Sequence, residues 1–567
     1  MKPNRFMLAL AALCFAAGGA SAQQTDGKSV APKTYKAYMV SDAHLDTQWN
    51  WDVQTTIREY IPRTLFQNLY LMERFPDYRF SFEGGVVYSW MKEYYPMHYE
   101  RMKKYIASGQ WHIAGASWDA NDPNMPSAES FFRNILLGQE FYKKEFGVRS
   151  TDIFLPDCFG FGYTLPTIAA HSGLIGMSTQ KLSWRNHDFY DAPYHKKNPF
   201  SWGVWYGIDG SSVIAAFDTG GYNSELPENV QYNERLMERA AHGYDNTCFR
   251  YYAGGGEGVG DKGNSGTVTT CRRLTKAIND PNAPIEIISA TSDDLFKAYL
   301  GRKAELPSFD GELLMDVHAT GCYTSQTAMK YYNRRNEELT GAAERASVAA
   351  DWLGALAYDQ RKLTEIWQRF IWHQFHDDLT GTSIPEAYTW SWNDELIALR
   401  QGGDVMNSAV GALSYSLDTR VKGTPVVVYN AVTYPVKAVV EAEIPLAAKA
   451  KGVAVYGPDG RRVAAQILSR EGDKAVIAFA ADVKSVGYAV YDVRPASPAK
   501  SSALKVNGNT IENGVYKLTL DRNGDIASLV DKRYGRELVE QGKAFRLAIF
   551  EGNPSNEWPA WEVLKEL

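Results

Sequence analysis

The residues best suited to chemistry occur in three short segments that lie far apart in the chain. The first segment, Ser41–Trp49, contains His44 and Asp46 two positions apart. Side chains two apart in an extended strand point the same way. An imidazole nitrogen and a carboxylate oxygen that point together make half of a four-ligand zinc site. A hydrogen-bonded histidine at the end of a strand is the alternative interpretation of this pair.

The second segment, Ile153–Gly162, places Asp157 after an apolar run and before a turn that contains glycine. Pro156 lacks the amide hydrogen that would continue a strand, so we expect Asp157 to lie where the strand ends. A carboxylate at that position can bind a metal or attack a substrate carbon. A turn aspartate without a chemical role is the alternative, because aspartate is common in turns.

The third segment, Ile371–Thr382, contains His373, His376 and Asp377. Histidines three apart on a helix share a face, and we expect Gly381 to end this helix. The alternative is that the histidines stabilise the helix C-terminus as cations. Together the three segments hold the parts of a His/Asp/Asp/His zinc site, but sequence spacing does not establish that they meet.

Strands and helices alternate in the part of the chain that carries the first two segments. This alternation predicts a parallel α/β sheet or barrel, in which chemistry lies beyond the carboxyl ends of the strands. We therefore predict a seven-stranded parallel, barrel-like catalytic domain over residues 31–325. Its predicted strands are Tyr35–Ser41, Tyr78–Glu83, His112–Ala116, Asp152–Leu155, Gly176–Thr179, Val213–Phe217 and Ile285–Ser289.

The remainder of the chain changes from helical to β patterns. Residues 326–417 are predicted to form a three-helix bundle, and residues 424–567 a β-sandwich region in which Asn523-Gly524 is a strong hairpin-turn signal. The fold class is thus multidomain, with α/β, α and β parts. The predicted helices of the bundle are Gln326–Ala357, Gln360–Phe375 and Pro385–Leu417.

The N-terminus reads as an export signal. Lys2 and Arg5 precede an apolar stretch and the small residues Ala20-Ser21-Ala22, which predicts a signal peptide over residues 1–22. No apolar run has the length of a membrane span, and the net charge of −6 argues against nucleic acid. We expect an exported protein, periplasmic or extracellular, without membrane insertion. One disulfide is possible among the four later cysteines, Cys158, Cys248, Cys271 and Cys322.

Taken in order, the three motifs resemble those of glycoside hydrolase family 38 α-mannosidases. They are His-x-Asp-x-x-Trp at 44–49, Pro-Asp-x-Phe-Gly at 156–160 and Phe-His-Asp-Asp-Leu-Thr-Gly-Thr at 375–382. Several distinctive motifs in one order are more specific than any single one. Supporting matches are Pro126-Ser-Ala-Glu-Ser130, Gln180-Lys-Leu-Ser-Trp184, Gly207-Ile-Asp-Gly210 and Cys322-Tyr-Thr-Ser-Gln326.

The resemblance implies one Zn²⁺ per chain and assigns roles to the motif residues. The implied zinc ligands are His44, Asp46, Asp157 and His376. Asp157 would also be the catalytic nucleophile, Trp49 would stack under the mannose ring, and Asp377 would hydrogen-bond sugar hydroxyls. Lys181 falls where the family often has a basic residue near the nucleophile.

The implied reaction is retaining exo-hydrolysis of terminal α-D-mannosyl residues from a glycan, through a covalent glycosyl-aspartate. Such an enzyme needs a second carboxyl group, about 5–5.5 Å from the first, as the acid/base. We place it at Asp316, with Glu312 and Asp310 as alternatives. His318 shares a face with Asp316 in extended backbone and could line the site too. The glycine-rich run 254–258 indicates a loop that borders the site.

Members of the family usually carry a larger C-terminal β region, so the resemblance also implies that the β-sandwich region here is incomplete. Two other functions stay open. One is a zinc-dependent carbohydrate deacetylase, in which the metal activates water to attack an acyl carbon. The other is an inactive mannoside-binding fragment. Linkage preference, natural glycan and oligomeric state are not predicted.

Overall fold

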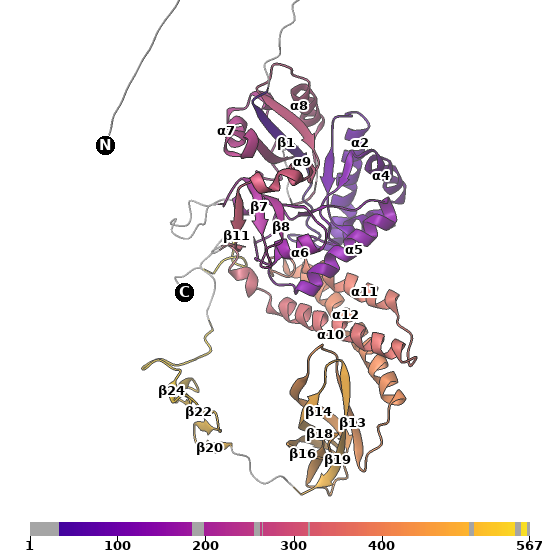
Figure 1. Cartoon of the computed structure of the whole chain (residues 1–567), viewed down its shortest axis with the longest axis vertical. Helices are drawn as coiled ribbons and strands as arrows, with labels where there is room; N and C mark the ends of the chain where they lie inside the picture. Colours follow the sequence, from indigo (N-terminus) through magenta and orange to yellow (C-terminus); the bar gives the residue numbers. More distant parts are fainter. Residues whose placement is uncertain are drawn as a thin grey trace, which may run out of the picture.

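The computed structural model describes residues 33–183, 198–253, 261–263, 265–315, 318–497, 504–549 and 557–563 (Figure 1). An α/β region comes first, long helices follow, and the chain then continues in β structure. The predicted signal peptide and the predicted acid/base Asp316 lie outside the described residues.

The α/β region holds short strands separated by helices. Its strands are β1 (Tyr35–Ser41), β2 (Phe80–Phe82), β3 (Trp111–Ile113), β4 (Asp152–Phe154), β5 (Gly160–Phe161), β6 (Gly176–Ser178), β7 (Trp202–Tyr206), β8 (Ser212–Ala216), β9 (Thr247–Tyr252), β10 (Ile285–Ala290), β11 (Ser308–Asp310) and β12 (Leu313–Leu314). Its α-helices are α1 (Val53–Thr55), α2 (Ile61–Met72), α3 (Gly85–Tyr94), α4 (Pro96–Ser108), α5 (Ala128–Phe146), α6 (Leu165–His171), α7 (Glu234–His242), α8 (Val268–Ile278) and α9 (Asp294–Tyr299).

All seven predicted strands are present, but they do not pair as one parallel barrel within the described residues. β1 lies between β9 and β10 in a three-stranded parallel sheet, while β11-β7-β8-β6-β4 is a separate five-stranded sheet. β7 and β8 are antiparallel because a tight turn joins them, in which the amide of Gly207 donates to the carbonyl of Ser211 over 2.8 Å. The mixed α/β character is confirmed, and the strands missing from the prediction, β7 and β9 among them, account for the difference in pairing.

β1 is buried on both faces, which explains its apolar sequence. Ala37 and Met39 point into one core cluster, whereas Val40 points into another. A strand covered on both sides is typical of parallel sheets flanked by helices. β1 ends at Ser41, and the segment with His44 and Asp46 follows at once. β4 in the five-stranded sheet leads in the same way to Asp157, so two strand ends deliver three of the candidate ligands.

Helix α5 shows how sequence signals set the bounds of an element. It begins after Ser127, whose hydroxyl accepts a hydrogen bond from the amide of Ser130, an N-cap that satisfies a backbone donor of the first turn. It ends at Gly147 with φ 73°, a left-handed conformation that favours glycine. Gly138 in its middle packs directly on the backbone of Ala116 and Ser117, so the helix approaches the chain after β3 with no room for a side chain.

Three long helices, α10 (Thr327–Trp352), α11 (Gln360–Ile371) and α12 (Pro385–Ser416), follow the α/β region (Figure 1). Each begins within one residue of its predicted start. α10 packs along α12, and α11 packs against both. After α11 and a short 3₁₀ turn, η8 (Trp372–Gln374), the chain leaves the helix and carries His376 towards the α/β region.

The β region starts with two sheets packed face to face. One has the order β13-β19-β15-β16 and the other β14-β18-β17, and apolar side chains from both fill the space between them. A further sheet follows, in the order β20-β21-β22-β23-β24. The strands are β13 (Thr424–Asn430), β14 (Val436–Pro445), β15 (Gly452–Tyr456), β16 (Arg462–Val463), β17 (Ala465–Glu471), β18 (Lys474–Val483), β19 (Gly487–Ala496), β20 (Lys505–Asn507), β21 (Thr510–Glu512), β22 (Tyr516–Leu520), β23 (Ile526–Asp531) and β24 (Arg536–Glu537).

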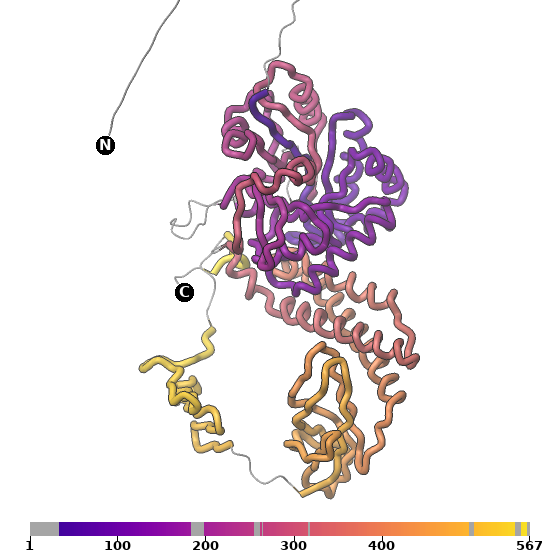
Figure 2. Tube along the Cα trace, viewed as in Figure 1, coloured from indigo at the N-terminus to yellow at the C-terminus, as the bar shows by residue number. Residues whose placement is uncertain are grey.

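The last described segment, residues 557–563, does not stay with the β sheets. Figure 2 shows it in yellow beside the α/β region, where the carbonyl of Trp561 accepts a hydrogen bond from the amide of Gly321 over 2.7 Å. The four described cysteines, Cys158, Cys248, Cys271 and Cys322, are buried and free, so the disulfide allowed by the sequence is not formed. Among the described residues, no helix is long and apolar enough to cross a membrane.

The close packing of α5 predicts that Gly138→Ala lowers stability, although alanine is the better helix former. A β-carbon at Gly138 would overlap the backbone of Ala116 and Ser117, and such overpacking costs about 1–3 kcal/mol. The matched control is Gly411→Ala in α12, where a β-carbon meets no atom within 4 Å. That change should stabilise by about 1 kcal/mol. Scanning calorimetry should therefore show opposite shifts of Tm; equal shifts would contradict the packing described.

Candidate metal centre

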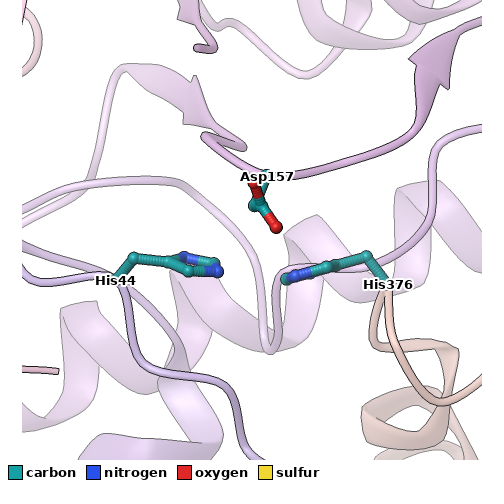
Figure 3. A group of neighbouring side chains, drawn as sticks. All are labelled: His44, Asp157 and His376. Atoms are coloured by element: carbon teal, nitrogen blue, oxygen red, sulfur yellow. The ribbon is translucent and has the colours of Figure 1, made fainter. Parts of the chain in front are cut away.

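Side chains from all three sequence segments converge at one buried point. Figure 3 shows His44, Asp157 and His376 pointing towards one another, and one ligand atom from each lies within 4.8 Å of the others. Asp46 belongs to the same cluster, because its Oδ1 lies 2.9 Å from Nε2 of His44 and 3.4 Å from Nε2 of His376. The residues that the resemblance assigns to zinc are thus brought together by the fold.

The cluster leaves polar atoms without hydrogen-bond partners. Both ring nitrogens of His44, Oδ1 of Asp46 and Nε2 of His376 are buried and make no well-aligned hydrogen bond among the described residues, although Oδ1 of Asp46 lies 2.9 Å from Nε2 of His44. Buried polar atoms without partners are costly and rare. A cation would give a partner to Oδ1 of Asp46, Nε2 of His376 and one ring nitrogen of His44, and two imidazoles with two carboxylates are a donor set that suits Zn²⁺. The residues therefore fit the metal that the resemblance implies.

His376 is oriented from outside the cluster. Its Nδ1 lies 3.0 Å from the carbonyl oxygen of Ala120. A carbonyl can only accept, so Nδ1 carries the proton and Nε2 is left free to face the cluster. A second contact of this kind is usual for metal-binding histidines, because it sets the tautomer and the ring orientation.

Asp157 is held by two donors that follow β6. Its Oδ1 accepts hydrogen bonds from Nζ of Lys181 at 2.9 Å and from Nε2 of Gln180 at 3.1 Å. The amides of both residues donate to the carbonyl of Pro156. Burial opposes ionisation of Asp157, but the Lys181 ammonium and the nearby imidazoles outweigh it and lower its pKa. Asp157 is accordingly a carboxylate, able to bind a cation or to act as a nucleophile.

The segment that carries His44 and Asp46 is fixed by residues 261–263. The amide of Asp46 donates to the carbonyl of Asp261 over 2.8 Å, and the amide of Gly263 donates to the carbonyl of His44 over 2.7 Å. The Asp261 side chain also lies close to the cluster and accepts a hydrogen bond from the hydroxyl of Tyr222. Burial and the charges of Asp46 and Asp157 raise the pKa of Asp261 to about 6.

Asp261 is therefore a further carboxylate at the site, and sequence reasoning missed it. The one signal nearby is the glycine-rich run 254–258, which indicates a site-bordering loop and precedes Asp261 by a few positions. Tyr222 lies at a predicted strand end, but no signal in the sequence distinguishes it; its ring packs against that of His44, with 4.7 Å between centroids.

Asp377 adjoins the cluster beside His376. Its Oδ2 lies 3.7 Å from Nε2 of His376, and its Oδ1 accepts a hydrogen bond from the hydroxyl of Thr382. Burial raises the pKa of Asp377 to about 7. The side chain is thus a buried polar group at the edge of the candidate metal centre.

His373, in contrast, points away from the centre. Its Nδ1 lies 2.6 Å from Oδ2 of Asp378, and its Nε2 lies 3.3 Å from Oδ2 of Asp394 on α12. Burial opposes protonation, but these two carboxylates outweigh it and raise the pKa of His373 to about 9. The expectation that His373 and His376 share a helix face is wrong, because the backbone becomes extended at Phe375 (φ −45°, ψ 141°). His373 instead helps to join α11 and α12.

Trp49 is half-buried and packs against the same hydrophobic group as Phe159, whose ring centroid lies 6.1 Å from that of His376. Its ring meets those of Trp51 and Trp561 edge-on, with centroids 6.1 and 6.5 Å away. Its backbone is held at both ends, since its amide donates to the carbonyl of Trp51 and its carbonyl accepts from the amide of Ile384. Trp49 is thus a rigid aromatic surface next to the cluster.

None of the three predicted acid/base candidates is placed beside Asp157 by the described residues. Asp316 lies outside them. Asp310 is exposed and accepts a hydrogen bond from the hydroxyl of Tyr163, and Glu312 is exposed too. The choice among the three acid/base candidates stays a prediction.

Family models match three successive parts of the chain. Residues 34–312 match the glycosyl hydrolases family 38 N-terminal domain, residues 317–413 the alpha mannosidase middle domain, and residues 511–567 the glycosyl hydrolases family 38 C-terminal domain. The residues matched by the N-terminal domain model include His44, Asp46 and Asp157, and those matched by the middle domain model include His376.

Curated relatives and solved structures agree with these models. Alpha-mannosidase G of Dictyostelium discoideum is 29% identical over 93% of this chain and 49% of its own length. Alpha-mannosidase 2C1 of Homo sapiens is 27% identical over 97% of this chain and 49% of its own length. The chain therefore spans about half the length of these relatives. A solved alpha-mannosidase from Enterococcus faecalis has the same fold, with a TM-score of 0.70, 19% identity, and coverage of 89% of this chain and 61% of that one.

The unpartnered donors predict that the purified protein binds one divalent metal ion per chain and that His376→Ala loses it. Removing one of four ligands should weaken binding at least about tenfold. The matched control is His242→Ala, which removes an exposed histidine at the end of α7 and should leave the metal content unchanged. Elemental analysis after dialysis measures both; full metal occupancy in His376→Ala would contradict this assignment.

Proposed function

The chain belongs to glycosyl hydrolase family 38, and we propose that it is a zinc-dependent retaining exo-α-mannosidase acting on terminal α-D-mannosyl residues. The observation that carries the proposal is the buried group of unpartnered donor atoms on His44, Asp46 and His376 beside the ionised Asp157. Such a group is suited to holding a cation next to a nucleophile. The substrate class is a mannose-containing oligosaccharide or glycan.

The metal would be held by His44, Asp46, Asp157 and His376. When bound there, Zn²⁺ would act as a template that fixes the 2- and 3-hydroxyls of the mannose and helps distort its ring. The imidazoles bring no charge of their own when neutral, so the two carboxylates balance the charge of the cation. His376 keeps its orientation through the carbonyl of Ala120.

Asp157 is the proposed nucleophile. Its carboxylate attacks the anomeric carbon while the bond from that carbon to the aglycone oxygen breaks, and the acid/base residue gives its proton to that oxygen. Water then attacks the same carbon, passes a proton to the acid/base residue and releases Asp157, so the anomeric configuration is retained. Lys181 and Gln180 hold Oδ1 of Asp157 throughout, and Asp316 is the proposed acid/base.

Two further residues are proposed to bind the sugar. The rigid face of Trp49 suits the apolar side of a pyranose ring. Asp377, buried beside His376, has carboxylate oxygens that can accept hydrogen bonds from sugar hydroxyls. In this proposal a bound ring is held between the aromatic face of Trp49 and the polar cluster.

We predict that Asp157→Asn lowers kcat on an aryl α-D-mannoside at least about a thousandfold, because the amide cannot form the glycosyl-enzyme. Proton NMR of the wild-type reaction should show the α-anomer of mannose as the first product. The matched control is Asp404→Asn, which makes the same chemical change at an exposed position of α12. Metal content is measured for each variant, so that loss of the metal is separated from loss of the nucleophile.

Measurements of mannose release, acetate release and mannose binding decide between the proposed function and its alternatives. Wild-type rates in Asp157→Asn would exclude the mechanism. Release of acetate from acetylated sugars, with no release of mannose, would indicate a deacetylase. Binding of mannose by the metal-loaded protein without turnover would indicate a binding protein.

We also propose that the protein is exported and that residues 1–22 are its signal peptide, on the basis of Lys2, Arg5 and the Ala20-Ser21-Ala22 site. Expression with the natural N-terminus in a Gram-negative host should yield a periplasmic protein that begins at Gln23. Intact-mass measurement checks this directly. A protein that keeps residues 1–22 and stays in the cytoplasm would refute it.

A further inference from the structure

We propose that residues Trp558–Glu562, here called the latch, position the loop formed by residues 318–325 at the edge of the active site. Glu562 is the positioning residue, and it acts through His318. The inference rests on the proposed function, because the loop matters only if chemistry takes place beside it. It assigns a role in the reaction to residues that follow the last sheet of the β region.

The latch meets the loop through backbone contacts. The amide of Gly321 donates to the carbonyl of Trp561 over 2.7 Å, and the hydroxyl of Ser325 donates to the carbonyl of Ala560 over 2.7 Å. The approach is so close that a β-carbon at Gly321 would lie 2.5 Å from the Ala560 carbonyl oxygen. The glycine therefore permits a contact that no other residue type allows without displacing the latch.

His318 and Glu562 form the polar part of this contact. Nδ1 of His318 lies 3.2 Å from Oε1 of Glu562, and both residues are buried, with exposed fractions of 8% and 4%. A buried carboxylate requires a donor, and a histidine whose Nδ1–H donates to a carboxylate is fixed in tautomer and ring plane. Trp558 meets the His318 ring edge-on and Trp561 stacks on it, with centroids 5.5 and 6.4 Å away.

The same aromatic group reaches the proposed nucleophile. Phe159, two residues after Asp157, packs with His318 and Trp561 at centroid distances of 6.1 and 6.5 Å. Its ring also lies 4.6 Å from the ammonium of Lys181, which holds Asp157. Phe159 thus contacts both the latch and Lys181, so a displacement of the latch would change the packing around Lys181 and Asp157.

The latch also holds a described residue that is close in sequence to the proposed acid/base. His318 follows Asp316 by two positions, and two residues span at most about 7 Å. Glu562 and the two tryptophans therefore fix the ring of a residue that is only two positions from the proposed acid/base in sequence. An acid/base group displaced by about 1 Å can cost a hundredfold in rate, so a positioning contact at this distance is expected to act mainly on kcat.

The test compares Glu562→Gln with Glu562→Asp. We expect Glu562→Gln to lower kcat on an aryl α-D-mannoside at least about tenfold with little change in KM, and Glu562→Asp, which keeps the carboxylate, to recover part of the loss. The matched control is Glu557→Gln, an exposed glutamate outside the latch, which should leave kcat unchanged. Metal content and Tm are measured for every variant; unchanged kcat in Glu562→Gln would overturn the proposal.

A double-mutant cycle tests whether Glu562 acts through His318. If it does, Glu562→Gln should have little further effect on kcat in a His318→Gln background, because contacting residues are not additive. Fully additive effects of the two substitutions on kcat would contradict an action of Glu562 through His318.

Hydrogen exchange tests the latch independently of catalysis. Exchange of the backbone amides in residues 318–325 should be faster in Glu562→Gln than in wild type. If wild type shows no turnover, the proposed function fails while the exchange measurement still decides whether the latch holds the loop.

Discussion

The structure depends on the burial of two imidazoles and two carboxylates at one point. Burial of such groups is unfavourable unless every charge and lone pair is compensated, and here Oδ1 of Asp46 and Nε2 of His376 have no hydrogen-bond partner among the described residues. The surrounding contacts make this arrangement rigid. The carbonyl of Ala120 orients His376. Hydrogen bonds from Lys181 and Gln180 hold Asp157. Backbone hydrogen bonds with residues 261–263 fix the segment from His44 to Asp46.

The fold explains how residues so far apart in sequence meet. β1 and β4 belong to different sheets, yet the segments that follow them both end at the cluster. The third contribution comes from the extended backbone after α11, which breaks the helical register at Phe375. This break sends His376 to the candidate metal centre and leaves His373 to contact Asp378 and, on α12, Asp394. One irregular residue thus directs two nearby histidines to different surroundings.

Much of this arrangement could be predicted from the sequence, and the missing parts have physical reasons. The hydrophobic pattern located β1 with its observed bounds. The order of the motifs led to the prediction that one zinc ion is bound by His44, Asp46, Asp157 and His376. β7 and β9 were missed. β7 pairs antiparallel with β8, which rules out a simple parallel barrel among the described strands, whereas β9 pairs parallel with β1. Asp261 and Glu562 were missed because their contacts are tertiary: no local periodicity or spacing marks a carboxylate that meets the site from a distant segment.

The contact between His318 and Glu562 joins residues 244 positions apart, and this separation has a consequence for folding. The entropy lost on closing a loop grows only slowly with its length, but contacts between distant residues form late and slow the search for the native state. The helices α10–α12 and the β sheets lie between the two partners in sequence and can gain structure earlier. The contact between His318 and Glu562 is therefore expected to form only after the intervening helices and sheets have brought its two partners together.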